Sequence, residues 1–318
     1  ARLVPSFTYP AQNVTAHECS LAGLPVQSDR NITVTQLRPN APQNLRLILN
    51  TTPGPGYEEA TLNWTLSTSP DVFNYVIYTT DSWSAGFNFS NPRAMVPYNT
   101  TNWTDPTSDG VDERYYIVRA NNTLGLMDEN TYAVAKWNLK LYTGWNLISL
   151  PLLIWDESMN SVFYTATHRD ICQRWAGVSQ TFERTDYFSG SGWAGEFDTM
   201  QVDRGYWYFS KKAGYDSFPY NNTIVGAVPQ TERSETIYGS SWSMLGWTSV
   251  NIKDLNNVFT RPAHRDLLLY YDALNDVFAR SDYFSGGGWA GEFADINPGL
   301  GYWYYSKNAT TYMWEYQP

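Results

Sequence analysis

The segment RTDYFSGSGWAGEF, residues 184–197, returns almost unchanged as RSDYFSGGGWAGEF at residues 280–293. Twelve of the 14 positions are identical, and the two copies start 96 residues apart. The tripeptide HRD at 168–170 and the segment GYWY at 205–208 recur with the same offset. The sequence therefore predicts two tandem domains of about 90 residues each, because this period is too long for a solenoid unit.

The composition predicts an all-β protein. The 318 residues include 14 Trp and 24 Tyr, whereas only 16% are charged. Aromatic side chains favour strands, and the charged residues that support helices are scarce. Residues 267–271 and 277–280 have the pattern of a hairpin around a polar turn. A short helical turn is expected at 254–259, with Asp254 as its N-cap.

The net charge of −10 and the pI of about 4.8 exclude several partners. Nucleic acid binding needs clustered Lys and Arg, so no nucleic-acid partner is expected. The same charge disfavours an anionic membrane surface. The sequence has no run of 18 apolar residues, so no membrane span is expected.

Four regions follow from these patterns. Residues 1–40 have widely spaced prolines, which suit an extended arm or a small strand segment. Residues 41–141 form the second region. The duplicated part divides into residues 142–236, here named repeat 1 and including a linker, and residues 237–318, named repeat 2.

Residues 41–141 contain about seven short strand patterns separated by turn residues, as expected for a β-sandwich. In the segment ATLNWT, residues 60–65, Ala60, Leu62 and Trp64 share one face by period-2 alternation. The PQNL opening, Trp64, the YVIY strand and YYIVRANN resemble a fibronectin type III domain. This resemblance implies an Ig-like sandwich that acts as a spacer or adhesion module and carries no chemistry.

The repeats have a second resemblance. GWNLISLP at 144–151 opens repeat 1, and PGLGYW at 298–303 closes repeat 2. Together these segments resemble a β repeat of secreted prokaryotic surface proteins, many of them archaeal. Each copy keeps only one end of the pattern. The resemblance implies a cell-surface or filament protein.

Ten N-glycosylation sequons favour an extracellular protein with covalent glycans. Eight of them lie within residues 1–121, which suggests that the N-terminal part faces solvent and that the repeats pack against something. The sequon asparagines are Asn13, Asn31, Asn50, Asn63, Asn88, Asn99, Asn102, Asn121, Asn221 and Asn308. Cys19 and Cys172 are the only cysteines; they either form one disulfide or remain free buried thiols.

No enzyme activity is expected. Three His and two Cys give no zinc spacing, so no metal or cofactor is predicted. The segment from Asp105 to Gly110 resembles the start of a calcium loop, but position 12 is Tyr116 instead of Glu. The HRD tripeptide lacks the other kinase motifs, so we interpret it as structural.

Six aromatic and acidic residues of the repeats are candidate ligand or interface residues. The tryptophans suit stacking on sugar rings or packing between subunits, and the carboxylates suit hydroxyl groups or a partner's cation. A buried core is the competing interpretation for the same aromatics. The candidates are Trp193, Glu196, Trp207, Trp289, Glu292 and Trp303.

The sequence thus favours an extracellular, glycosylated structural subunit that assembles with itself into a filament, sheath or surface layer. The arm from Ala1 to Val26 is expected to add a strand to a neighbouring subunit. The alternatives are a tandem carbohydrate-binding or adhesion module, or an accessory part of a secreted glycoside hydrolase.

Overall fold

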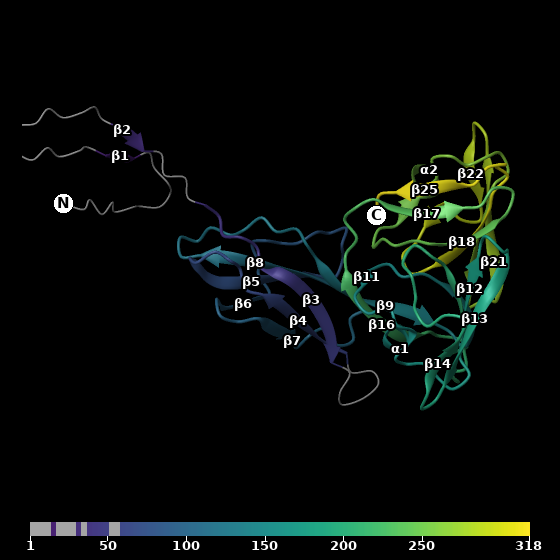
Figure 1. Cartoon of the computed structure of the whole chain (residues 1–318), viewed down its shortest axis with the longest axis horizontal. Coiled ribbons are helices and arrows are strands. Elements are labelled where there is room, and N and C mark those ends of the chain that lie inside the picture. Colours follow the sequence, from purple (N-terminus) through teal and green to yellow (C-terminus); the bar gives the residue numbers. More distant parts are fainter. Residues whose placement is uncertain (1–13, 17–29, 33–36, 51–57) are drawn as a thin grey trace, which may run out of the picture.

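The computed structural model describes residues 14–16, 30–32, 37–50 and 58–318. Strands dominate this part, which confirms the all-β class; its two α-helices, α1 (Met159–Val162) and α2 (Leu255–Val258), have four residues each. No helix among the described residues is long and apolar enough to cross a membrane. Figure 1 shows a sandwich at one end of the molecule and the two repeats at the other.

The sandwich has seven strands in two sheets. The first sheet has the order β3-β4-β7, and the facing sheet contains the run β9-β8-β5-β6. This three-on-four arrangement is that of a fibronectin type III-like sandwich, as the sequence predicted. The strands are β3 (Gln43–Asn50), β4 (Glu59–Thr65), β5 (Val72–Thr80), β6 (Ala94–Pro97), β7 (Asn102–Asp105), β8 (Glu113–Asn122) and β9 (Val134–Leu141).

The core of the sandwich follows the predicted alternation. Ala60, Leu62 and Trp64 of β4 are buried on one face. Trp64 meets Tyr75 of β5 edge to face, with ring centroids 5.6 Å apart. These side chains fill the space between the two sheets.

The facing sheet continues beyond β9. β16 (Tyr220–Ala227), which lies in the region predicted as repeat 1 with its linker, pairs antiparallel with the whole of β9, from Tyr220↔Leu141 to Ala227↔Val134. β11 (Leu153–Ile154) pairs with β16 and completes a six-stranded sheet. The sandwich and repeat 1 therefore share one continuous sheet.

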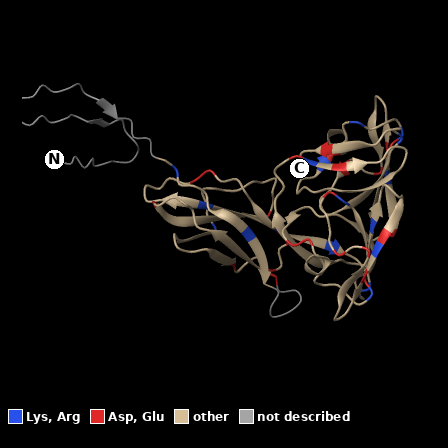
Figure 2. Ribbon diagram, viewed as in Figure 1, with Lys and Arg blue, Asp and Glu red and all other residues tan. Residues whose placement is uncertain are grey.

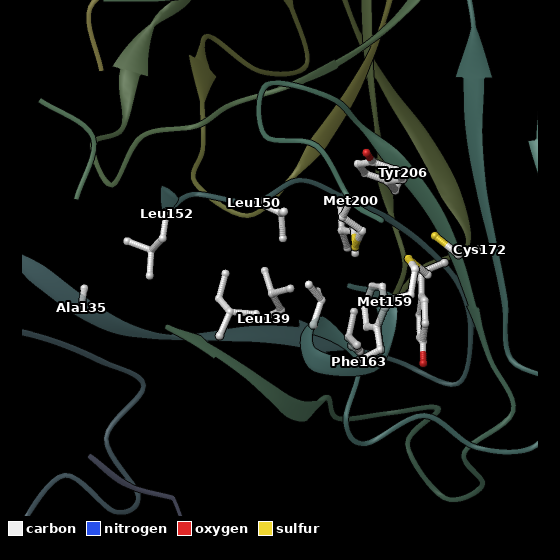
Figure 3. Packing of buried hydrophobic residues seen from close by; sticks show 14 of the residues in the cluster. Ala135, Leu139, Leu150, Leu152, Met159, Phe163, Cys172, Met200 and Tyr206 are labelled. Atoms are coloured by element: carbon white, nitrogen blue, oxygen red, sulfur yellow. The ribbon is translucent and has the colours of Figure 1, made fainter. Parts of the chain in front are cut away.

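This shared sheet is buried on both faces. Tyr116 and Val118 of β8 point into the sandwich, whereas Tyr115 and Ile117 belong to the core of repeat 1. Because both faces are covered, β8 has five consecutive buried residues instead of an alternating pattern. Figure 3 shows Leu139 of β9 pointing into the same cluster as side chains of repeat 1.

The two repeats have the same topology. Each contains a five-stranded antiparallel sheet, with the order β10-β15-β12-β13-β14 in repeat 1 and β18-β24-β20-β21-β22 in repeat 2. The repeat 1 strands are β10 (Gly144–Ile148), β12 (Ile171–Ala176), β13 (Thr181–Phe188), β14 (Gly192–Gly195) and β15 (Tyr206–Ser210). The repeat 2 strands are β18 (Trp242–Gly246), β20 (Leu267–Asp272), β21 (Val277–Phe284), β22 (Gly288–Gly291) and β24 (Gly301–Tyr305).

Repeat 2 also explains why β16 joins β9. In repeat 2 the strand before the sheet, β17 (Arg233–Ile237), pairs with the strand after it, β25 (Tyr312–Tyr316). β9 and β16 occupy the same two places in repeat 1. β9 is therefore the last strand of the sandwich and, at the same time, the first strand of the repeat 1 fold.

Several local predictions are confirmed. β20 and β21 form the predicted hairpin, and Asp254 caps α2 by accepting a hydrogen bond from the backbone N–H of Asn256. β19 (Lys253–Asp254) and β23 (Asp295–Ile296) form a short pair beside α2. In the N-terminal region, β1 (Val14–Ala16) pairs with β2 (Arg30–Ile32), and the rest of residues 1–36 lies outside the described residues.

Cys172 is a free thiol, fully buried in the core of repeat 1. Burial raises the pKa of this thiol above its ordinary value, so the group stays protonated at neutral pH. The structure thus has Cys172 in the state of the free-thiol alternative. Cys19, its predicted disulfide partner, lies outside the described residues.

The shared sheet leads to a stability prediction. A fragment of residues 37–141 should unfold at a clearly lower temperature than the sandwich within the full chain, because it loses the β9·β16 ladder and exposes Tyr115 and Ile117. Thermal unfolding of both proteins, followed by circular dichroism, tests this. Equal midpoints would show that the sandwich is stable without repeat 1.

Candidate functional site

The two motif tryptophans that the sequence offered as ligand platforms lie in the repeat cores. Trp193 and Trp289 are each 7% exposed. Trp193 packs against Phe163 with ring centroids 5.8 Å apart, and Trp289 packs against Phe259 at 5.4 Å. Trp193 and Trp289 are therefore core residues, in agreement with the competing interpretation.

The two motif glutamates have a local structural role. Glu196 is exposed, and its Oε2 accepts a hydrogen bond from the backbone N–H of Arg184 at 2.7 Å. Glu292 does the same for Arg280 at 2.7 Å. The backbone N–H of each glutamate also donates to the carbonyl of the same arginine, at 2.9 and 2.8 Å, so the glutamate extends the pairing of β14 with β13 and of β22 with β21 by one residue. This gives a reason for keeping the carboxylate in both copies.

The HRD tripeptide of repeat 1 is hydrogen-bonded to the duplicated segment and to the neighbouring strand β15. Asp170 is fully buried and accepts hydrogen bonds from the hydroxyl of Tyr208 at 2.6 Å and the backbone N–H groups of Thr167 at 2.8 Å and Lys211 at 2.6 Å. His168 Nδ1 accepts from the backbone N–H of Ser189, within the duplicated segment, at 3.2 Å.

Repeat 2 reproduces this arrangement. Asp266 accepts from Tyr304, Ala263 and Lys307, and His264 Nδ1 accepts from Ser285 at 3.2 Å. The tripeptide therefore holds each repeat together, as the sequence predicted.

The remaining two tryptophans lie between the repeats. Trp207 and Trp303 alternate with core tyrosines along β15 and β24, so they point to the outer face of each five-stranded sheet. These outer faces meet. We name this contact the repeat seam, and its aromatic residues are Trp145, Trp175, Trp207, Tyr271 and Trp303.

The repeat seam is reciprocal. Trp207 of repeat 1 packs on Tyr271 and Phe278 of repeat 2, with ring centroids 5.0 and 5.9 Å apart. The equivalent Trp303 of repeat 2 packs on Trp175 and Phe182 of repeat 1, at 5.2 and 5.8 Å. Each contact that a residue of repeat 1 makes with repeat 2 is thus matched by the contact that the equivalent residue of repeat 2 makes with repeat 1.

The backbone obeys the same exchange. Isolated bridges join Ile148 to Leu300 and Arg204 to Leu245, and these two pairs are equivalent under the duplication. The repeats are thus related by an approximate two-fold axis, as in an isologous dimer, but within one chain. The aromatic faces that the sequence offered as a surface between subunits cover each other.

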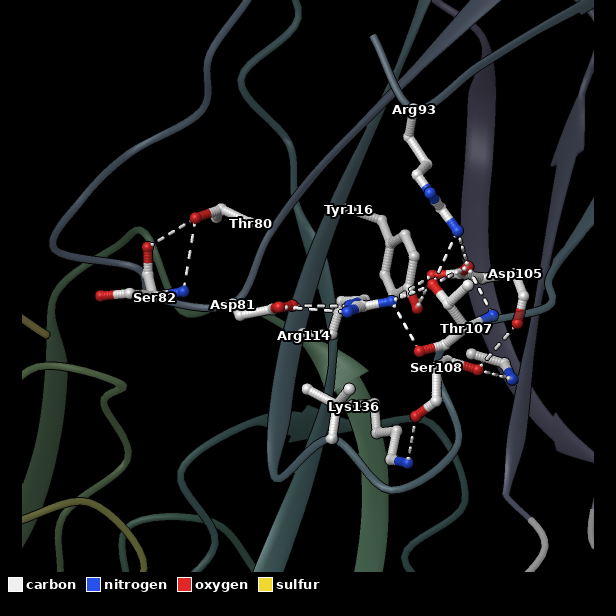
Figure 4. Close-up of polar contacts among 12 residues, drawn as sticks. Thr80, Asp81, Ser82, Arg93, Asp105, Thr107, Ser108, Arg114, Tyr116 and Lys136 are labelled. Atoms are coloured by element: carbon white, nitrogen blue, oxygen red, sulfur yellow. Dashed lines mark hydrogen bonds and ion pairs between the residues drawn. The ribbon is translucent and has the colours of Figure 1, made fainter. Parts of the chain in front are cut away.

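Two polar networks contain buried charged side chains, one within the sandwich and one between the sandwich and repeat 1, and neither was predicted from the sequence. In the first, Asp105 is fully buried and its carboxylate accepts from Arg93 and Arg114 at 3.2 and 2.9 Å and from Tyr116 at 3.1 Å (Figure 4). Burial raises the pKa of Asp105, but the hydrogen bonds from Arg114 and Thr107 outweigh it and hold that pKa below its usual value. Asp105 is the first residue of the calcium-loop pattern, and its carboxylate is paired with the two arginines.

The second network crosses from the sandwich into repeat 1. Lys136 of β9 is fully buried, and its Nζ lies 2.8 Å from the carbonyl of Ser108 and 3.4 Å from the Glu58 carboxylate. Burial lowers the pKa of Lys136, and Glu58 opposes this shift. Glu58 also accepts from Tyr164 of repeat 1 at 2.6 Å and from Thr223 of β16. Breaking one partner of such a buried pair is costly, so the network fixes the junction.

Charged side chains are otherwise scattered along the ribbon (Figure 2). A groove of about 550 Å³ lies between β9 and repeat 2 and carries several of them. Lys140 pairs with Asp112 at 2.5 Å, and Glu113 accepts from the hydroxyl of Tyr115 at 2.6 Å. Burial raises the pKa of Glu113. These groups partner one another, so the groove presents little unmet charge to a ligand.

The sequon asparagines differ in exposure. Four are exposed, and four are half-buried. The exposed ones are Asn50, Asn88, Asn99 and Asn102; the half-buried ones are Asn63, Asn121, Asn221 and Asn308. Asn13 lies outside the described residues, and Asn31 lies in β2, where side chains are not described.

One pair of sequons shares a position on the sheet. Asn63 of β4 is directly opposite Asn102 of β7. Side chains at directly opposite positions are neighbours about 5 Å apart on one face. Two glycans at this pair would therefore compete for the same space.

No family model matches the chain, and no curated protein matches it. Solved structures with similar folds are fibronectin type III-like. One is a Fn3-like protein from Clostridium thermocellum (22% identity, 30% of this chain, 90% of that chain, TM-score 0.25). Others are the central fibronectin-III array of RIM-binding protein (10%, 82% and 97%, TM-score 0.25) and the FN1–FN3 domains of chicken CNTN1 (12%, 88% and 99%, TM-score 0.22).

The buried aspartates give a first prediction for this region. Replacing Asp170 by Asn should destabilise the protein by about 3 kcal/mol, because an amide cannot accept from three donors as a carboxylate does. The control is Asp186→Asn, which removes an exposed pair with Arg184 and should cost under about 1 kcal/mol. Chemical denaturation measures both, and equal losses would contradict the anchoring role of Asp170.

The repeat seam gives a second prediction. A Cβ on Gly205 would lie 2.7 Å from Met244 Cγ and 2.8 Å from the carbonyl of Leu245, so Gly205→Ala should push the repeats apart and lower the melting temperature by several degrees. Gly287→Ala is the matched control, since its Cβ would meet Phe284 only at ordinary contact distance. A Gly205→Ala protein that melts with the wild type would show that the seam tolerates separation.

Proposed function

We propose that the protein is an extracellular, N-glycosylated structural subunit that assembles with itself into a filament, sheath or surface layer, of the kind found on prokaryotic and particularly archaeal cells. The observation that carries this proposal is the continuity of the described chain. One sheet runs from the sandwich into repeat 1, and the reciprocal seam joins repeat 1 to repeat 2. A subunit that bears load in a polymer benefits from such stiff junctions between its parts.

The surface chemistry supports an extracellular place. Asn88, Asn99 and Asn102 are exposed sequon residues on the sandwich. Glycans there need not disturb the cores. The net charge of −10 favours solubility of the separate subunit before assembly.

The contact between subunits has to use other surfaces than the seam aromatics, because Trp207 and Trp303 are engaged within the chain. Strand addition by the N-terminal segment, residues 1–26, is our proposal for this contact. The sandwich has edge strands that can accept a strand, since β6 and β3 each end a sheet in the described part.

A carbohydrate-binding or adhesion module is the second candidate, and a pocket at the repeat seam favours it.

The proposal predicts ordered polymers. Negative-stain electron microscopy of the purified chain should show filaments or sheets, and a variant lacking residues 1–26 should remain monomeric, because it has no strand to donate. Light scattering on both proteins quantifies the difference. Monomers from the intact chain under all assembly conditions would contradict the structural role, and polymers from the truncated chain would contradict strand addition.

Glycopeptide mapping of protein from its natural source is the companion measurement. We expect glycans at Asn88 and Asn99, and at one but not both of Asn63 and Asn102 in each molecule. An unglycosylated chain would remove the support for an extracellular location.

A further inference from the structure

A small open pocket of about 240 Å³ lies at one end of the repeat seam. Both repeats contribute to it, so it exists only when the two are joined. Five of its six lining side chains are aromatic. The six are Trp145, Gln173, Phe182, Trp207, Tyr271 and Phe278.

The aromatic rings form walls that face different directions. Trp207 lies at 79° to Trp145, at 68° to Tyr271 and at 87° to Phe278, with centroids 5.0–5.9 Å apart. The rings support one another edge to face, so the pocket keeps its shape without a ligand. Phe278 remains 47% exposed at the rim, which leaves a large apolar surface open to solvent.

Gln173 is the one amide in this aromatic lining. It pairs with Trp207 across the strands β12 and β15, so the two side chains are neighbours on the seam face. No described residue makes a hydrogen bond with the Gln173 side chain, although its amide offers two donors and an acceptor. A ligand in the pocket would find these groups available.

The lining contains no Lys, Arg, Asp or Glu. An anion would therefore meet no counter-charge, and a cation would meet no carboxylate. Aromatic faces with one free amide match a ligand that has an apolar ring face and neutral hydroxyl groups. The volume is below the 300–1,000 Å³ of pockets for drug-sized ligands, so it suits a single ring.

We infer that this seam pocket binds one neutral hexopyranose unit at the end of a glycan. The sugar ring packs against the aromatic walls formed by Trp207 and the exposed Phe278, which stand at 87° to each other, and the Gln173 amide exchanges hydrogen bonds with its hydroxyl groups. This inference does not depend on self-assembly, because a monomer contains the complete pocket.

The equivalent place at the other end of the seam has a different lining. There Leu269 occupies the position equivalent to Gln173, so the free amide is missing. Trp175 Nε1 donates to the carbonyl of Trp242 at 3.1 Å, and the amide of Gln180 bonds to the backbone of the same Trp242. The polar groups at this end are thus bonded to each other, whereas the Gln173 amide is not. The two ends of the seam therefore differ in chemistry although the fold is duplicated.

Titration of the full chain with methyl glycosides of glucose, galactose, mannose and N-acetylglucosamine tests the inference, with tryptophan fluorescence and saturation-transfer NMR as readouts. At least one glycoside should bind saturably and perturb the fluorescence of the seam tryptophans. Gln173→Leu, which installs the side chain found at position 269, should weaken binding about tenfold through the lost hydrogen bonds. Phe278→Ala should weaken it further.

Phe284→Ala is the matched control, because Phe284 is a comparably exposed aromatic of β21 outside the pocket. It should bind as the wild type does. Thermal melting of each variant verifies folding; should Phe278→Ala fail to fold, Gln173→Leu decides alone. No binding of any glycoside would overturn the inference, as would binding that Gln173→Leu leaves unchanged. Saturable binding of tetramethylammonium in place of the glycosides would instead identify a cation cage.

Discussion

The antiparallel ladder between β9 and β16 is the interaction on which the described structure depends. It joins eight residue pairs and makes β9 a member of two folds. Because a strand has two edges and two faces, β9 can pair with β8 and β16 at once while its sheet covers the sandwich core on one side and the repeat 1 core on the other. The buried Lys136 and Glu58 then fix the position where the two cores meet.

The repeat seam buries the outer faces of the two five-stranded sheets, one from each repeat. Each repeat sheet buries its inner tyrosines in its own core and exposes tryptophans on its outer face. An exposed aromatic face of this kind would favour aggregation or association with another surface in water. Since the two repeats are near-copies, their outer faces are complementary to each other in the manner of an isologous dimer, and the chain satisfies both at once. The two ends of the seam differ because the copies differ in sequence outside the duplicated segment, at Gln173 and Leu269 among other positions.

The duplicated segment has a structural role in each repeat. Its tryptophan fills the core, its glutamate accepts a hydrogen bond from the backbone N–H of the arginine that begins the segment, and the backbone N–H of its serine donates to the histidine of the HRD tripeptide. Each of these interactions lies within one repeat. The segment is therefore a structural unit built twice.

The sequence by itself determined the all-β class, the sandwich strands such as β4, the duplication and the Asp254 cap, because these follow from alternation, exact repetition and short-range hydrogen bonds. It also named Trp207 and Trp303 among six candidate ligand or interface residues, without separating them from the core tryptophans. Only the tertiary structure decided what those residues meet, that β16 belongs to the sheet of the sandwich, and that Lys136 lies beside Glu58, 78 positions away in the chain. The physical reason is that strand pairing and face-to-face packing join residues at long separation, and local periodicity shows which face a residue is on but not what covers that face.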